Sequence, residues 1–421
     1  MKRVLYVGLL LLVGAAVVFA GGKKEAPAVE GTAASGVVKI GFLAPLTGDA
    51  AAWGLPGLYG AQMWMEDVNA AGGIKAGGKS YKVELVTYDE ENVASKALLG
   101  AKKLVLEDKV AVVLMMAGAT VTACQSFFTE NKVLSMSLAP YDTRAEAPYH
   151  LCAAEPSLVY HLASIPYIAK TYPNVKRVAI VAQDDEIGRQ GLAYLRAACE
   201  SAGLQVVYDK FYGFETTDFA PIMTAILNAK PDLISFDGGY SYYVELLAEQ
   251  AYLMGFEGII ESSEFFLSSL LAKVPADWAE GAVASFADWD DPKLPKYCHD
   301  FYAEYTQRWP GQWGAVSWEY AANLDIWKFG VESADSIDPM EVFKALKSAE
   351  TIPHVYGEGV WSGKEIWGID NFLATPWHNT EVRNGKHVIV NTQPILGWFY
   401  QPGNKEILLK HLKAAGVYYV K

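Results

Sequence analysis

The 421-residue sequence has few of the side chains that build most catalytic and metal centres. Its seven histidines are scattered, and its four cysteines form no C-x-x-C pair, so neither zinc nor redox chemistry is indicated. His150 and Cys152 form one H-x-C pair, but further ligands are missing and a structural histidine is favoured. We expect no metal and no cofactor. The cysteines allow three disulfide pairings or four buried free thiols, and the sequence does not choose. They are Cys124, Cys152, Cys199 and Cys298.

Catalytic motifs and positive charge are also scarce. The sequence contains no G-x-S-x-G, no H-E-x-x-H, and no G-x-G-x-x-G after the first expected strand, which argues against an enzyme. There are 35 Lys and Arg against 48 Asp and Glu, a net charge of −13, and no dense basic stripe. This balance excludes nucleic acid as an expected partner. A hydrophobic content of 52% predicts a globular chain with large cores.

A long apolar run is present only at the N-terminus. Lys2 and Arg3 precede a mainly apolar stretch over 4–19, and Val18 and Ala20 suit the −3 and −1 positions of a cleavage site. The run is shorter than the roughly 20 residues that span a bilayer. We therefore predict a signal peptide over 1–20 and a flexible leader over 21–36. With no cysteine at the cut, the mature chain is expected in the periplasm or secreted, without stable membrane insertion.

The stretch from Gly73 to Ser80 satisfies the phosphate-loop pattern G-x-x-x-x-G-K-[ST]. A phosphate loop joins a strand to the N-terminus of the following helix. Here a helical pattern precedes the motif and a strand pattern follows it, so the glycines are predicted to end a helix. Lys79 and Ser80 are then expected at the entrance of a strand, as surface residues, and nucleotide binding is not expected.

Two successive segments alternate between strand and helix periodicity, which predicts two doubly wound lobes with parallel sheets. Expected strands are 37–43, 81–89, 110–116, 132–137, 177–185, 204–212, 232–239 and 258–263. Expected helices are 58–71, 94–108, 122–131, 188–202, 218–228 and 242–254. Beyond residue 287 the pattern indicates helices near 297–309, 318–334 and 339–349, and a strand over 386–391. Ligands of such sheets bind beyond the carboxyl ends of the strands.

Four features of the first segment occur together: P-L-T-G at 45–48, Trp53-Gly54, N-x-x-G-G-I at 69–74 and Asp89. In this combination they resemble type I periplasmic binding proteins of the branched-chain amino acid class, and the second segment also looks like that family. The resemblance implies a three-stranded hinge, crossing near 153–155, 285–287 and 366–370. It divides the chain into lobe 1 (37–153 with 287–367) and lobe 2 (154–286 with 368–421).

The resemblance also implies the function. We expect a monomeric receptor that captures a small amino acid, carboxylate or amide between the lobes and delivers it to an ABC transporter permease, without making or breaking a bond. A periplasmic sensor subunit that feeds a signalling receptor is the alternative, and genome neighbourhood would separate the two. An extracytoplasmic enzyme is disfavoured, since no nucleophile and base are visible.

Site residues follow from two turns and from the family pattern. Gly118, Ala119 and Thr120 form a small-residue turn from a strand to a helix, which suits a ligand carboxylate. In the family, this turn and the next, here Ala139 and Tyr141, hold the ligand's carboxylate and ammonium. Ordinary connections remain the alternative.

The resemblance places three further residues at the cleft. Glu264 stands where the family has its ammonium-pairing glutamate, with a solvated loop carboxylate as the alternative. Tyr240 stands at an aromatic position lining the cleft. Trp53 is either a wall of the side-chain pocket or a core residue. The sequence departs from the family at Tyr141, at Ile187 and in its hydroxyl-poor first turn. These departures leave aromatic amino acids, amides and other small carboxylates open as ligands.

Overall fold

The computed structural model describes residues 35–420, apart from 49, 214, 237–240, 264, 266, 288 and 315 and the side chains of 241 and 242. The predicted signal peptide and residues 21–34 of the predicted leader lie outside the described residues. Over the described ranges, no helix is both long and apolar enough to cross a membrane.

One sheet has nine strands in the order β12-β13-β14-β6-β5-β4-β1-β3-β2, and its central pairs are parallel. Its strands are β1 (Gly36–Ala44), β2 (Ile74–Ala76), β3 (Lys79–Asp89), β4 (Val112–Met115), β5 (Ser135–Ser137), β6 (His150–Cys152), β12 (Ile352–His354), β13 (Gly357–Ser362) and β14 (Phe372–Ala374). The helices that follow or join these strands are α1 (Ala51–Ala70), α2 (Ala94–Lys102), η1 (Lys103–Asp108), α3 (Ala119–Asn131), η2 (Pro140–Asp142), α10 (Lys296–Arg308), α11 (Val316–Ala334), α12 (Pro339–Ser348) and α13 (Lys364–Trp367).

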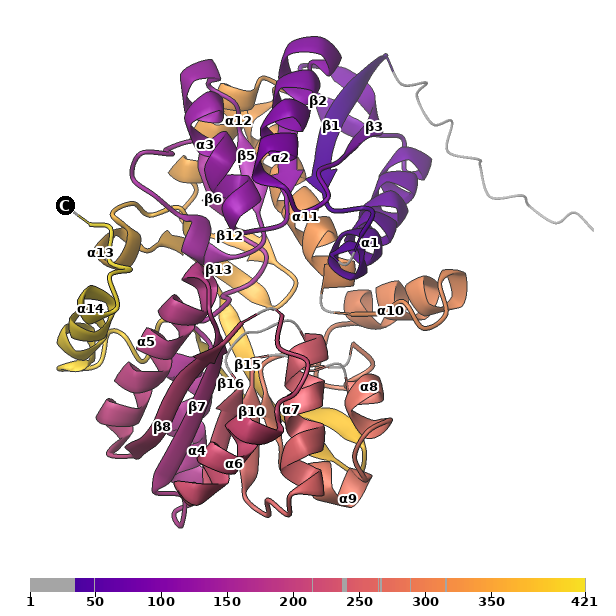
Figure 1. The fold of residues 1–421 in the computed structure, drawn as a ribbon. Coiled ribbons are helices and arrows are strands. Elements are labelled where there is room, and N and C mark those ends of the chain that lie inside the picture. The colour runs from indigo at the N-terminus through magenta and orange to yellow at the C-terminus, as the bar shows by residue number, and fades with distance from the viewer. Residues whose placement is uncertain are drawn as a thin grey trace, which may run out of the picture. The chain divides into compact units, whose positions relative to one another are not determined.

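A second sheet has seven strands in the order β16-β15-β11-β10-β9-β7-β8, with parallel pairing from β8 to β11 (Figure 1). Its strands are β7 (Arg177–Gln183), β8 (Gln205–Tyr212), β9 (Leu233–Phe236), β10 (Ile259–Ser262), β11 (Val283–Ala284), β15 (Pro376–Arg383) and β16 (Lys386–Pro394). The accompanying helices are α4 (His161–Thr171), α5 (Glu186–Ala202), α6 (Ala220–Asn228), α7 (Ser241–Leu253), α8 (Leu267–Leu271), α9 (Ala276–Ala279) and α14 (Asn404–Ala414).

The central strands are buried because their sequences are continuous apolar runs. Every residue of β4 and β9 is buried, as expected for parallel strands covered on both faces. The predicted α/β fold with two doubly wound sheets is confirmed, and each predicted strand and helix overlaps an observed one, although α1 begins at Ala51 rather than at residue 58. The many tryptophans serve the core: Trp289, Trp318, Trp327 and Trp377 are fully buried.

The chain passes between the two sheets three times. It leaves the nine-stranded sheet after β6, returns after β11, and leaves again between β14 and β15. The last passage comes a few residues after the expected 366–370, because β14 still pairs with β6 of the first sheet. The lobe limits themselves stay a prediction.

The glycine-rich motif is a helix end followed by a hairpin, as predicted. Gly72 and Gly73 have positive φ after α1, and β2 pairs with β3 in antiparallel fashion. Lys79 is exposed, but the expectation for Ser80 was wrong: it is buried, and its hydroxyl donates to the carbonyl of Gly72. The motif therefore stabilises the turn from helix to strand.

The residues of the H-x-C pair are structural. His150 is buried, with Nδ1 2.9 Å from the Ser135 hydroxyl and Nε2 3.0 Å from that of Ser137. Burial lowers the pKa of His150 to about 3, so the imidazole is neutral at ordinary pH. All four cysteines are buried and free. Among the described residues, no group of His, Cys, Asp and Glu could hold a metal ion.

Candidate ligand-binding site

A cavity of about 190 Å³ lies beyond the carboxyl ends of strands from both sheets. Turns after β3, β4 and β5 and the first turns of α1 and α11 contribute from one sheet, and the ends of β7 and β10 from the other. The segment between β6 and α4 also lines it. The lining residues are Trp53, Asn92, Met116, Ala117, Gly118, Ala119, Leu138, Tyr141, Glu155, Ser157, Tyr160, Gln183, Asp185, Ile187, Ser263, Val316 and Glu319. This is the position where open α/β sheets bind ligands.

Four predicted site residues line this cavity together: Trp53, Gly118, Ala119 and Tyr141. Two others are buried beside the lining rather than in it. Thr120 donates its hydroxyl to the carbonyl of Ala117 at 3.3 Å, and Ala139 follows the lining residue Leu138. Tyr240 and Glu264 lie outside the described residues. Ligand contact stays a prediction for each of the eight.

The first turn is bonded to a carboxyl group of the protein itself. Gly118 caps α3 with φ +79°, a left-handed value that favours glycine. Its N–H lies 3.0 Å from both carboxyl oxygens of Asp142, which is buried in η2. Burial raises the pKa of Asp142 to about 8, although the Gly118 N–H and Arg144 favour the charged form. One N–H expected to meet a ligand carboxylate is thus already occupied.

Asp142 makes the stability of the protein depend on pH. Because the folded-state pKa exceeds the ordinary aspartate pKa of 3.8, the folded state retains a proton that the unfolded state has lost, and stability falls as pH rises from about 4 to 8. Asp142→Asn keeps an acceptor for Gly118 and removes the proton. We expect its melting temperature, relative to wild type, to increase steadily from pH 5 to pH 8 in differential scanning fluorimetry. A pH-independent difference would contradict the assignment.

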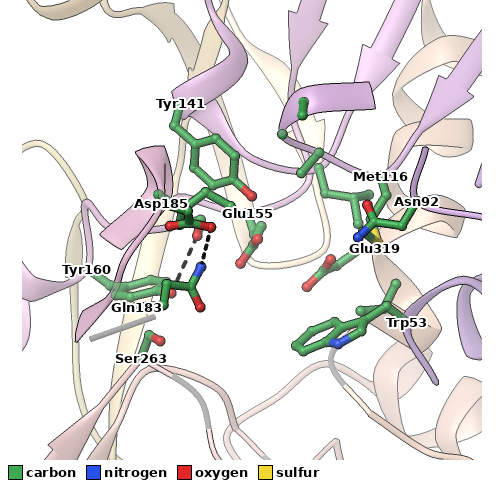
Figure 2. A pocket seen from close by; sticks show the side chains of 17 residues that line it. Trp53, Asn92, Met116, Tyr141, Glu155, Tyr160, Gln183, Asp185, Ser263 and Glu319 are labelled. Carbon is green, nitrogen blue, oxygen red and sulfur yellow. Dashed lines mark hydrogen bonds between the residues drawn. The ribbon is translucent and has the colours of Figure 1, made fainter. Parts of the chain in front are cut away.

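At the other sheet, the end of β7 presents a fixed amide and carboxylate. Asp185 caps α5: its Oδ1 accepts from the N–H of Gly188 at 2.8 Å, and its Oδ2 accepts from Nε2 of Gln183 at 2.8 Å. Burial raises the pKa of Asp185 despite these hydrogen bonds. Gln183 is 2% exposed, and its Oε1 has no partner among the described residues (Figure 2). The amide therefore turns an unpaired acceptor toward the cavity.

Two further carboxylates enter the cavity from different parts of the chain. Glu319, 2% exposed, comes from the first turn of α11, and Glu155 from the segment after β6. Figure 2 shows both side chains pointing into the same space, with the rings of Trp53, Tyr141 and Tyr160 around it.

Sequence reasoning missed Glu155, Gln183 and Glu319. Glu155 and Gln183 had an available signal, because both follow or end a strand at the edge where ligands bind. Glu319 had none, since it lies inside a helical pattern far along the chain.

Residues 37–386 match the family described as periplasmic binding protein, and the chain belongs to that family. It is 26% identical over 325 residues to the Leu/Ile/Val-binding protein BraC3 of Rhizobium johnstonii, covering 76% of this chain and 86% of the relative. It is 25% identical over 361 residues to the leucine-, isoleucine-, valine-, threonine- and alanine-binding protein of Pseudomonas aeruginosa, covering 83% and 92%.

Solved structures share the fold. A leucine-binding protein LivK from Thermotoga maritima has a TM-score of 0.70 at 19% identity and covers 85% of this chain and 99% of its own. A solute-binding protein of an ABC transporter from R. palustris, solved with 4-hydroxybenzoate, has a TM-score of 0.70 at 19% identity and covers 85% and 97%. The predicted resemblance to type I periplasmic binding proteins is confirmed, and the relatives in this family are solute-binding proteins.

Proposed function

We propose that this chain is the periplasmic solute-binding receptor of an ABC importer and passes its ligand to a membrane permease. The observation that carries the proposal is a cavity lined by strand-end turns of both sheets. The ligand is a small solute of the classes left open by the sequence, an amino acid or a related carboxylate or amide. The acidic lining favours those that carry an ammonium group.

The cavity can couple binding to a conformational change. Trp53 and Glu319 come from elements of the nine-stranded sheet, whereas Gln183 and Ser263 end strands of the seven-stranded sheet. A ligand that contacts both sets stabilises whichever arrangement brings them together, and the three passages between the sheets are the natural hinge. The monomeric receptor performs no covalent step, and the permease recognises the ligand-bound arrangement.

Thermal melting of the mature protein against amino acids, amides and aromatic acids tests the proposal. A solute present at roughly 100 times its Kd adds about 2.7 kcal/mol of stability, a shift of several degrees. We expect one class to produce such a shift, and Tyr141→Ala to abolish it because the variant removes a cavity wall. Tyr400→Ala is the matched control, since Tyr400 is 65% exposed and outside the cavity. If no solute raises the melting temperature, the receptor assignment is refuted.

A further inference from the structure

The charge of the cavity wall is one-sided. Its seventeen described residues include three carboxylates, Glu155, Asp185 and Glu319, and no Lys, Arg or His. Arg144 follows Tyr141 closely in sequence, but its guanidinium donates to the carbonyls of Tyr141 and Thr143 and, at 2.7 Å, to Glu186. The described wall thus offers a ligand anion no cationic side chain.

The positions outside the described ranges cannot reverse this balance. The ten positions between 35 and 420 that lie outside the described ranges contain no Lys, Arg or His. Four of them are acidic: Asp49, Asp237, Glu264 and Asp288. Wherever these residues lie, they add no compensating positive charge.

The Gln183 amide presents a hydrogen-bond acceptor at the cavity. The hydrogen bond from Gln183 Nε2 to the carboxylate of Asp185 fixes the orientation of the amide, because a carboxylate accepts and does not donate. Oε1 is left as a buried acceptor without a partner among the described residues. Leaving a buried acceptor unpaired costs stability, so the site favours a ligand that donates hydrogen bonds.

The other contacts suit a cation as well. Trp53, Tyr141 and Tyr160 present aromatic rings to the cavity, and such faces attract ammonium and guanidinium groups. At the first turn, Gly118 already donates its N–H to Asp142. The turn therefore offers a ligand carboxylate less than its sequence suggests.

We propose that the cavity selects a small organic cation, a solute whose ammonium or guanidinium groups outnumber its carboxylates at neutral pH. The ammonium group lies among Glu155, Glu319 and the aromatic rings and donates to Gln183. This inference rests on the proposed function, because it assigns a ligand class to the same cavity.

Four probes that share a linear carbon chain separate charge from shape. Lysine and cadaverine carry net positive charge, whereas norleucine and 6-aminohexanoate are neutral overall. We expect calorimetry at pH 7 and low salt to show lysine or cadaverine binding at least tenfold more tightly than either neutral probe. The difference in affinity between the charged and the neutral probes should become smaller at high salt, because salt screens the electrostatic attraction that causes it.

Two outcomes would overturn the inference. Tighter binding of norleucine, 6-aminohexanoate, an amide or an aromatic acid contradicts the cationic ligand and leaves the receptor assignment standing. If neither these four probes nor the wider panel of solutes binds, the receptor assignment fails together with the inference.

Glu319→Gln provides the matched variant, because it removes the charge at nearly constant volume. We expect it to weaken binding of the cationic probe at least tenfold, and Glu155→Gln to act in the same direction. Glu350→Gln is the control, since Glu350 is exposed and outside the cavity. Unchanged affinity in both Glu319→Gln and Glu155→Gln would overturn the inference.

Discussion

Replacing Glu261 with alanine should lower the free energy of unfolding by about 3–5 kcal/mol, because it breaks a fully buried charged network. Glu261 lies on β10 with no exposed side-chain surface. Its Oε1 is 2.9 Å from Nδ1 of His161 and accepts from Ser164 at 2.6 Å, while Oε2 accepts from Ser235. Truncation leaves a buried imidazole without its carboxylate. Urea denaturation of the two proteins at pH 7 measures the difference.

The pH dependence of this stabilisation is a second readout of the same network. Burial alone would raise the pKa of Glu261. The attraction to His161, together with the hydrogen bonds that the carboxylate accepts from His161 and the two serines, outweighs burial and lowers the pKa. The stabilisation is therefore present above the ordinary glutamate pKa of 4.5 and is lost as pH falls through the lower folded-state pKa. Glu84→Ala is the control, an exposed strand glutamate whose loss should cost less than about 0.5 kcal/mol. Equal costs for the two variants would contradict the network's role.

The arrangement of the sheets was predictable because their central strands are short apolar runs between helical patterns. The beginning of α1 was not: periodicity indicated a helix from residue 58, and the structure begins it at Ala51. The added segment contains Gly54, Pro56 and Gly57, which ordinary propensities place outside helices. Tertiary packing overrides propensity there, since a Cβ at Gly57 would lie 2.4 Å from the ring of Tyr320 on α11. A contact over such sequence separation leaves no local signal.

The cavity was predictable where it depends on strand ends and unpredictable where it depends on side chains that meet across the fold. Gly118 and Tyr141 follow strands of the first sheet, and both line the cavity. Asp142 accepts hydrogen bonds from the N–H of Gly118, so this N–H is no longer available to a ligand carboxylate. The two residues are 24 positions apart in different elements. Charge selectivity likewise depends on Glu319, which joins the cavity only because α11 packs against α1.

The second large effect is expected for Gly188→Ala, which should weaken ligand binding at least tenfold and cost about 1–3 kcal/mol of stability through overpacking. Gly188 lies in the first turn of α5, and a Cβ there would be 2.0 Å from the carbonyl oxygen of Gln183. Its N–H also donates to Asp185. The added methyl group must displace the end of β7, and with it the Gln183 amide and the Asp185 carboxylate that face the cavity.

Gly203→Ala separates this positional effect from a general loss of stability. Gly203 ends the same helix with φ +69°, and a Cβ there would meet nothing within 4 Å. Alanine in that left-handed conformation costs about 1–2 kcal/mol without moving either cavity residue. Calorimetry with the tightest-binding probe should therefore show wild-type affinity for Gly203→Ala and reduced affinity for Gly188→Ala. If both variants bind as wild type does, Gln183 and Asp185 do not contact the ligand, because the displacement of their strand end leaves recognition intact.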